Sequence, residues 1–186
     1  MKLLLLPLSM AAVVQADIQV GVGIGDLTGP ITDVHMMGMA NPSQISEGLH
    51  FRLFSRAFVA KDTDTDKHVA FASLDVGMGG FVIKNGVVDA LEKLYPGVYT
   101  DENVCLSGTH THSGPAGFLQ NTMLQFAGGG FVQATVDAFV NGTVASIVQA
   151  HNRFVNQLAC LPGFSYGYRY TRIHTKRNLQ YQRQQR

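Results

Sequence analysis

Disulfide bonds cannot be the main support of this fold, because the sequence contains only two cysteines, Cys105 and Cys160. Small exported domains that depend on disulfides for stability carry a denser set of cysteines. Cys105 lies within an apolar run, which predicts a buried free thiol rather than one half of a bridge.

The sequence also lacks an excess of charge of either sign. Fourteen Lys and Arg residues against thirteen Asp and Glu residues leave a formal net charge of +1. Such a balance creates no long-range field that would attract a polyanion. No nucleic-acid partner is therefore expected.

Apolar runs long enough to span a membrane are missing as well. At the N-terminus Lys2 precedes about a dozen mostly apolar residues, and Ala16 completes the small-residue pattern that signal peptidase cleaves. A membrane-spanning helix needs roughly 20 apolar residues, which this run does not reach. We therefore predict a signal peptide over residues 1–16 and a secreted, extracellular mature chain.

Several familiar motifs are incomplete. Gly21, Gly23 and Gly25 resemble a dinucleotide-binding fingerprint, but Asp26 occupies the place of its last glycine. Residues 62–66 have the carboxylate spacing of a calcium loop without its glycine and distal glutamate, so we expect a turn between strands. The sequence also has no Gly-x-Ser-x-Gly nucleophile elbow.

The apolar periodicities that are present predict one α/β domain. Alternation from Ile18 to Ile24 predicts a strand with one buried face, and residues 69–76 predict a buried strand. Helical spacing appears over residues 82–94 and 131–147, and a short strand is expected at 104–106. Strand, helix and strand in this order are typical of a parallel crossover. The predicted fold class is α/β, with a mixed or parallel sheet flanked by helices.

The end of the chain differs in character from the rest. Residues 154–186 are rich in Tyr, Arg and Gln and show no apolar period that could build a core. We therefore expect a folded portion over residues 17–153 and an aberrant, disordered tail over 154–186. The triplet Asn141–Thr143 is an N-glycosylation acceptor, although it falls within a predicted helix.

The residues suited to chemistry gather in one loop, Leu106–Pro115, with the sequence LSGTHTHSGP. On an extended segment, His110 and His112 would face the same side. Neutral imidazole binds zinc well, but catalytic zinc sites take three protein ligands and a water. The pair alone is therefore either part of a metal site or two hydrogen-bonded loop histidines. Ser113–Pro115 occupies the place of the Asp-His pair of a His-x-His-x-Asp-His hydrolase, which argues against that class.

Several motifs taken together resemble the N-terminal part of the neutral ceramidase family. The resemblance covers about residues 18–152 and keeps the family's order and spacing. It rests on five segments: Gly25–Pro30, Met36–Ala40, Gln44–His50, Arg52–Phe58 and Ser107–Pro115. It implies a zinc-dependent amidohydrolase that cleaves the amide of ceramide into sphingosine and a fatty acid. Peripheral contact with a membrane surface would accompany such a substrate.

The resemblance implies different roles for the two histidines. His110 is the implied zinc ligand, and His112 is the implied active-site residue that stabilises the transition state or transfers a proton. Family members are several times longer, and their other ligands, a histidine, a glutamate and a tyrosine, come from segments beyond this chain. We therefore expect the N-terminal portion of a ceramidase catalytic domain that is inactive alone. Alternatives are an inactive secreted fragment and a lipid-binding or interaction module.

Overall fold

The computed structural model describes residues 18–39, 41 and 43–156. The predicted signal peptide, the tail beyond Asn156 and Cys160 lie outside the described residues, so the predictions made for them stay predictions.

A five-stranded mixed sheet forms the centre of the domain, with strand order β6-β5-β4-β1-β7. Its strands are β1 (Ile18–Asp26), β4 (Phe54–Asp62), β5 (His68–Leu74), β6 (Val104–Gly108) and β7 (Val155–Asn156). Neighbouring strands are antiparallel except β5 and β6, which are parallel. The helix α1 (Phe81–Leu94) connects these two strands, so the predicted parallel crossover and the α/β class are confirmed.

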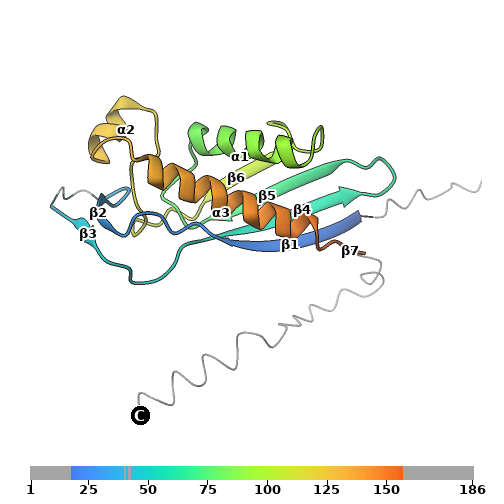
Figure 1. The fold of residues 1–186 in the computed structure, drawn as a ribbon, viewed down its shortest axis with the longest axis horizontal. Helices are drawn as coiled ribbons and strands as arrows, with labels where there is room; N and C mark the ends of the chain where they lie inside the picture. Colours follow the sequence, from blue (N-terminus) through green and yellow to red (C-terminus); the bar gives the residue numbers. More distant parts are fainter. Residues whose placement is uncertain (1–17, 40, 42, 157–186) are drawn as a thin grey trace, which may run out of the picture.

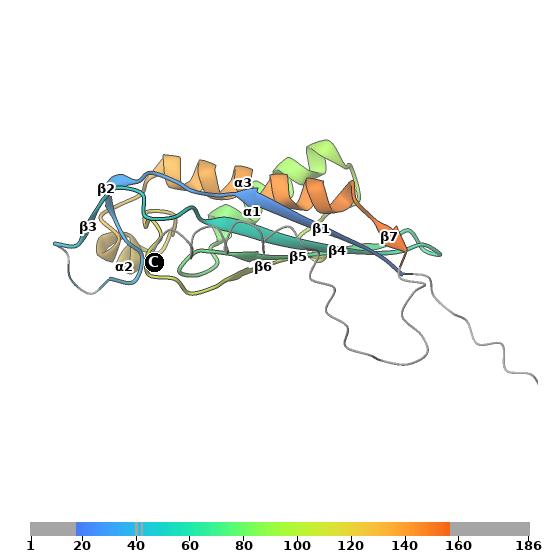
Figure 2. The same cartoon turned by 90° about the horizontal axis from the view of Figure 1, so that it is seen from below.

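Both long helices lie on the same face of this sheet, as Figure 2 shows. They are α1 and α3 (Gln133–His151), and α3 packs mainly on β1 and β4. A short helix α2 (Thr122–Ala127) and a two-stranded sheet of β2 (Thr32–His35) and β3 (Ile45–Glu47) lie at one end of the molecule (Figure 1). Among the described residues, no helix combines the length and apolar character needed to cross a bilayer.

The core lies between the sheet and the two helices. Helix α1 buries Ile83, Val87 and Leu91, which recur every four residues and therefore share one face. Pro96 follows the end of α1, as the sequence predicts, because proline cannot continue the hydrogen-bond ladder. The turn at residues 62–66 connects β4 and β5, also as predicted, and the Asp62 carboxylate accepts hydrogen bonds from Asp64 N and Thr65 Oγ1.

The prediction for the buried face of β1 is wrong. The strand forms, but its glycines are buried while Val22 and Ile24 on the opposite face are each 55% exposed. A Cβ atom added to Gly23 would lie 2.0 Å from Ser146 O of α3. The glycines are therefore the face on which α3 lies, because only their missing side chains allow so close an approach of helix and strand.

The sheet face away from the helices stays open in the described part of the chain. Val69 and Phe71 of β5 point to it, so this strand alternates between buried and exposed residues instead of being buried throughout. Cys105 also lies on this face, and the prediction of a buried thiol is wrong. The register places Phe71 beside Phe58 and Cys105, which extends the apolar surface across β4, β5 and β6.

A cluster of aromatic rings closes the far end of the core. His68 is 6% exposed and stacks on His151, with 5.5 Å between ring centroids. The Tyr99 hydroxyl hydrogen-bonds His151 Nδ1 at 2.8 Å, and Phe154 packs against both imidazoles. The described fold thus continues past residue 153 into β7.

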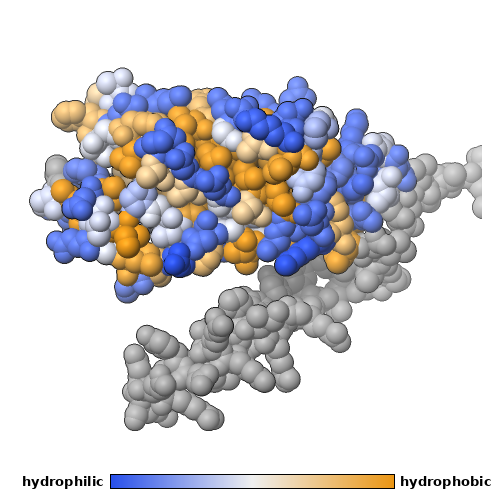
Figure 3. All heavy atoms as spheres, viewed as in Figure 1, coloured by the Kyte–Doolittle hydropathy of each residue, from blue (hydrophilic) through white to orange (hydrophobic). Residues whose placement is uncertain are grey.

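The side of the molecule that carries the helices is a mosaic of hydrophobic and hydrophilic patches (Figure 3).

Candidate active site in the histidine loop

The histidine loop begins where β6 ends, at Gly108, and lies beside the segment that follows β5. Backbone hydrogen bonds tie the two together: Thr109 N donates to Leu74 O at 2.8 Å, and His110 N donates to Val76 O at 3.0 Å. A Cβ atom at Gly108 would lie 3.0 Å from Met78 Cα, so a side chain there would require the neighbouring backbone to move. Parallel strands end at a common edge, and this edge is where α/β folds collect functional loops.

The two histidines meet, but not in the way that their spacing predicts. His110 has φ +64°, a left-handed conformation that costs a non-glycine residue on the order of 1–2 kcal/mol. The segment is therefore an irregular loop with a bend at residues 112–114, not an extended strand. The two rings nevertheless face each other, with 5.0 Å between centroids and 3.4 Å between their Nε2 atoms.

A backbone carbonyl sets the proton position on His110. Its Nδ1 lies 2.8 Å from Gly77 O, and because a carbonyl oxygen only accepts, Nδ1 must carry the proton. In neutral imidazole the lone pair then resides on Nε2, the atom that faces His112. An imidazole that donates from one nitrogen to a carbonyl and offers the other is the arrangement that metal-binding histidines use.

The donor set that surrounds His110 is incomplete for zinc. Within the described ranges, no three His, Cys, Asp or Glu side chains lie close enough to hold a metal ion. A catalytic zinc needs three protein ligands, so these residues fit one part of a zinc site and leave the other ligands to be supplied from elsewhere.

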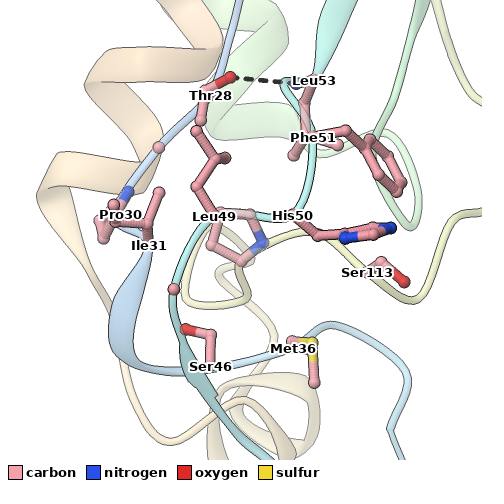
Figure 4. A pocket seen from close by; sticks show the side chains of 13 residues that line it. Thr28, Pro30, Ile31, Met36, Ser46, Leu49, His50, Phe51, Leu53 and Ser113 are labelled. Carbon is pink, nitrogen blue, oxygen red and sulfur yellow. Dashed lines mark hydrogen bonds between the residues drawn. The ribbon is translucent and has the colours of Figure 1, made fainter. Parts of the chain in front are cut away.

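A hollow of about 210 Å³ opens beside the histidine loop. Ser113, which directly follows His112, lies with His50 on one side of it, and Pro30 and Ile31 lie on the other (Figure 4). Three apolar side chains in its wall remain substantially exposed: Ile31 (42%), Leu49 (45%) and Phe51 (56%).

Polar contacts hold the upper wall of this hollow in place. Thr28 Oγ1 accepts a hydrogen bond from Leu53 N at 3.0 Å (Figure 4), and Thr28 N donates to Asp26 Oδ1 at 2.9 Å. Burial raises the pKa of Asp26, but the hydrogen bonds from Thr28 and the nearby Arg52 outweigh it and lower the pKa below its usual value. Asp26 is thus an anionic anchor for this wall.

Sequence reasoning missed two parts of the site. The Gly77 carbonyl is a backbone group, and the only signal was the glycine-rich end of the preceding strand, Gly77–Gly80. The hollow draws its walls from residues 28–53 and 113–115, whose proximity no periodicity predicts.

Comparison with known proteins decides the family. Residues 18–159 match the family model described as neutral/alkaline non-lysosomal ceramidase, N-terminal. The chain belongs to the neutral/alkaline ceramidase family. Neutral ceramidase 3 of Arabidopsis thaliana is 44% identical over 136 residues, which are 73% of this chain and 18% of that protein. The neutral ceramidase of Drosophila melanogaster is 39% identical over 147 residues, 79% of this chain and 21% of that protein.

The fold agrees with a solved ceramidase. The crystal structure of the neutral ceramidase from Pseudomonas aeruginosa matches with a TM-score of 0.73 and 36% identity, over 76% of this chain and 22% of that one. The chain thus spans about a fifth of the length of these ceramidases. The neutral ceramidase resemblance seen in the sequence is confirmed.

Proposed function

We propose that this chain is the N-terminal part of a zinc-dependent ceramidase that hydrolyses the N-acyl amide of ceramide to sphingosine and a fatty acid. The observation that carries the proposal is the His110 imidazole. Its Nδ1 donates to Gly77 O, which leaves the lone pair of Nε2 available to a metal ion. Family membership supplies the reaction class. Zinc, when bound, would polarise the amide carbonyl and acidify a water molecule.

The residues of this chain have separate tasks in that reaction. His110 would hold the metal through Nε2. His112 would stand beside it, because imidazole can take up and release a proton near neutral pH and can donate a hydrogen bond to a developing oxyanion. In the overall reaction water adds to the carbonyl carbon, the C–N bond breaks, and the amine leaves with a proton.

The hollow beside Ser113 supports a lipid as the substrate. Its exposed wall side chains Ile31, Leu49 and Phe51 would lose contact with water if a hydrocarbon chain lay against them, which favours binding. A lipid of this kind lies in a membrane, so we also propose peripheral contact with a membrane surface. The signal peptide predicted over residues 1–16 is the reason for proposing an extracellular location.

The test is a chimera in which residues 18–152 of this chain replace the matching segment of the Pseudomonas aeruginosa neutral ceramidase. We expect the 186-residue chain to bind zinc weakly and to turn over no fluorescent ceramide, because its described donors are too few. The chimera should turn it over. A folded chimera without turnover, beside an active parent, would refute the proposed function.

A lipid-binding module is the second candidate, and the apolar hollow is the observation that favours it. The two candidates separate in the same experiment. A module would bind a ceramide analogue as the isolated chain, and its segment would bring no hydrolytic activity to the chimera.

A further inference from the structure

One loop, residues 35–39, contacts the histidine loop over several consecutive residues. Met37 N donates to Gly114 O at 3.0 Å, and Ala116 N donates to His35 O at 2.8 Å. Met36 also forms an isolated antiparallel bridge with Pro115. The two loops are therefore held at a fixed separation, although residues 40–105 lie between them in the sequence.

Gly38 of this loop lies directly on the His112 ring. A Cβ atom built at Gly38 would be 3.0 Å from Cδ2, 3.0 Å from Nε2 and 3.1 Å from Cε1 of His112. Three consecutive ring atoms at nearly equal distances place this position above the face of the ring, close to its centre. The contact is tighter than side chains ordinarily make, so a real Cβ would press on the ring face and shift the ring by a few tenths of an ångström.

The ring that would move carries Nε2, the atom that faces His110. His112 Nε2 lies 3.4 Å from His110 Nε2, and His110 cannot follow freely because its Nδ1 is bonded to Gly77 O at 2.8 Å. The same loop supports that second contact. A Cβ atom at Gly77 would lie 2.6 Å from Met37 Cγ, so Met37 packs directly against the residue whose carbonyl holds His110.

We propose that Gly38 is a positioning residue that sets the His112 imidazole against His110, and that the loop of residues 35–39 supports both rings of the site. Glycine is favoured there for two reasons, because its φ of +86° is left-handed and because a side chain would crowd the His112 ring. The catalytic consequence rests on the proposed function, whereas the geometric claim does not.

The matched pair of variants is Gly38→Asn and Gly97→Asn. Both glycines are left-handed, with φ of +86° and +73°, and asparagine tolerates this conformation better than most residues. A Cβ atom at Gly97 would meet nothing within 4 Å, so the control carries the backbone change without the contact. Nuclear Overhauser cross-peaks between the ring protons of His110 and His112 in the 186-residue chain are the readout.

We expect Gly38→Asn to weaken these cross-peaks and Gly97→Asn to leave their intensity unchanged. Equal retention in both variants would overturn the proposal. The wild-type protein gives a test that needs no variant: the Gly38 Hα protons must show cross-peaks to the His112 ring, and their absence would also overturn it. In the chimera, Gly38→Asn should lower kcat while zinc content stays unchanged. If Gly38→Asn changes the cross-peaks in the 186-residue chain as expected but the unmutated chimera does not hydrolyse ceramide, only the proposed function is refuted.

Discussion

The contact between β1 and α3 should fail when a methyl group is added to Gly23. Alanine at this position would place its Cβ 2.0 Å from Ser146 O and 2.7 Å from Ala150 N. Real Cβ atoms essentially never approach closer than 3.0 Å, so α3 would have to move by about 1 Å. The atoms that obstruct the methyl group are backbone atoms, which cannot turn aside as a side chain does.

The cost follows from what that displacement disrupts. Overpacking of a core costs about 1–3 kcal/mol, and a 19-residue helix pressed on two strands has little freedom to relax. The buried hydrogen bond between Ser55 Oγ and Ser146 Oγ, 2.8 Å long, would be stretched, at a cost of about 1 kcal/mol. We therefore expect a loss of about 3 kcal/mol, which corresponds to a fall in Tm of roughly 10 °C for a domain of this size.

Thermal unfolding followed by circular dichroism measures this change. Gly48→Ala is the matched control, because a Cβ atom there meets nothing within 4 Å and the residue is not left-handed. It should leave Tm unchanged or raise it slightly, since alanine restricts the unfolded chain. If the Tm of Gly23→Ala equalled that of Gly48→Ala, the account of β1 as a glycine face for α3 would be wrong.

Two further predictions concern the ring cluster and the hollow. Burial and then the nearby His68 lower the pKa of His151, so its contribution to stability is complete above the unfolded value of about 6.5 and is lost as the pH falls through the lower folded value. Urea unfolding between pH 7 and pH 5 should therefore show decreasing stability, and an equal slope in His151→Gln would contradict this. In the chimera, Leu49→Ser should weaken binding of a ceramide analogue about fivefold, because covering a half-exposed leucine is worth about 1 kcal/mol. Val69→Ser, on the open sheet face, should bind as the wild type does in the same titration, and equal weakening in both would remove the hollow as the binding site.

Local periodicity was enough to predict the two long helices and the strands β1, β5 and β6, but not which of their faces are buried. The helix over Phe81–Leu94 was predictable because its apolar spacing and Pro96 act locally. In β1 the same kind of reasoning chose the wrong face. An apolar residue is buried only where another element packs on its side of the strand, and here α3 packs on the side of the glycines. Cys105 was misplaced for the same reason, since its apolar neighbours belong partly to an open face.

The site was predictable as a pair of histidines but not as a geometry. The shared side of His110 and His112 was argued for an extended segment, whereas the left-handed φ of His110 brings the rings together in an irregular loop. That conformation depends on Val76 O and Gly77 O, which are backbone groups of another segment. Such contacts leave no periodic trace in the sequence. The motif resemblance supplied the family, and the structure supplied the support for each ring.

The central proposal is that His110 binds zinc and that His112 transfers a proton or stabilises the oxyanion. Zinc content and ceramide turnover in two variants of the chimera test it most directly. His110→Ala should lose both the zinc and the turnover, because it removes the Nε2 donor. His112→Ala should keep the zinc and lose most of the turnover. A His110→Ala chimera that retains zinc and full turnover would contradict the account.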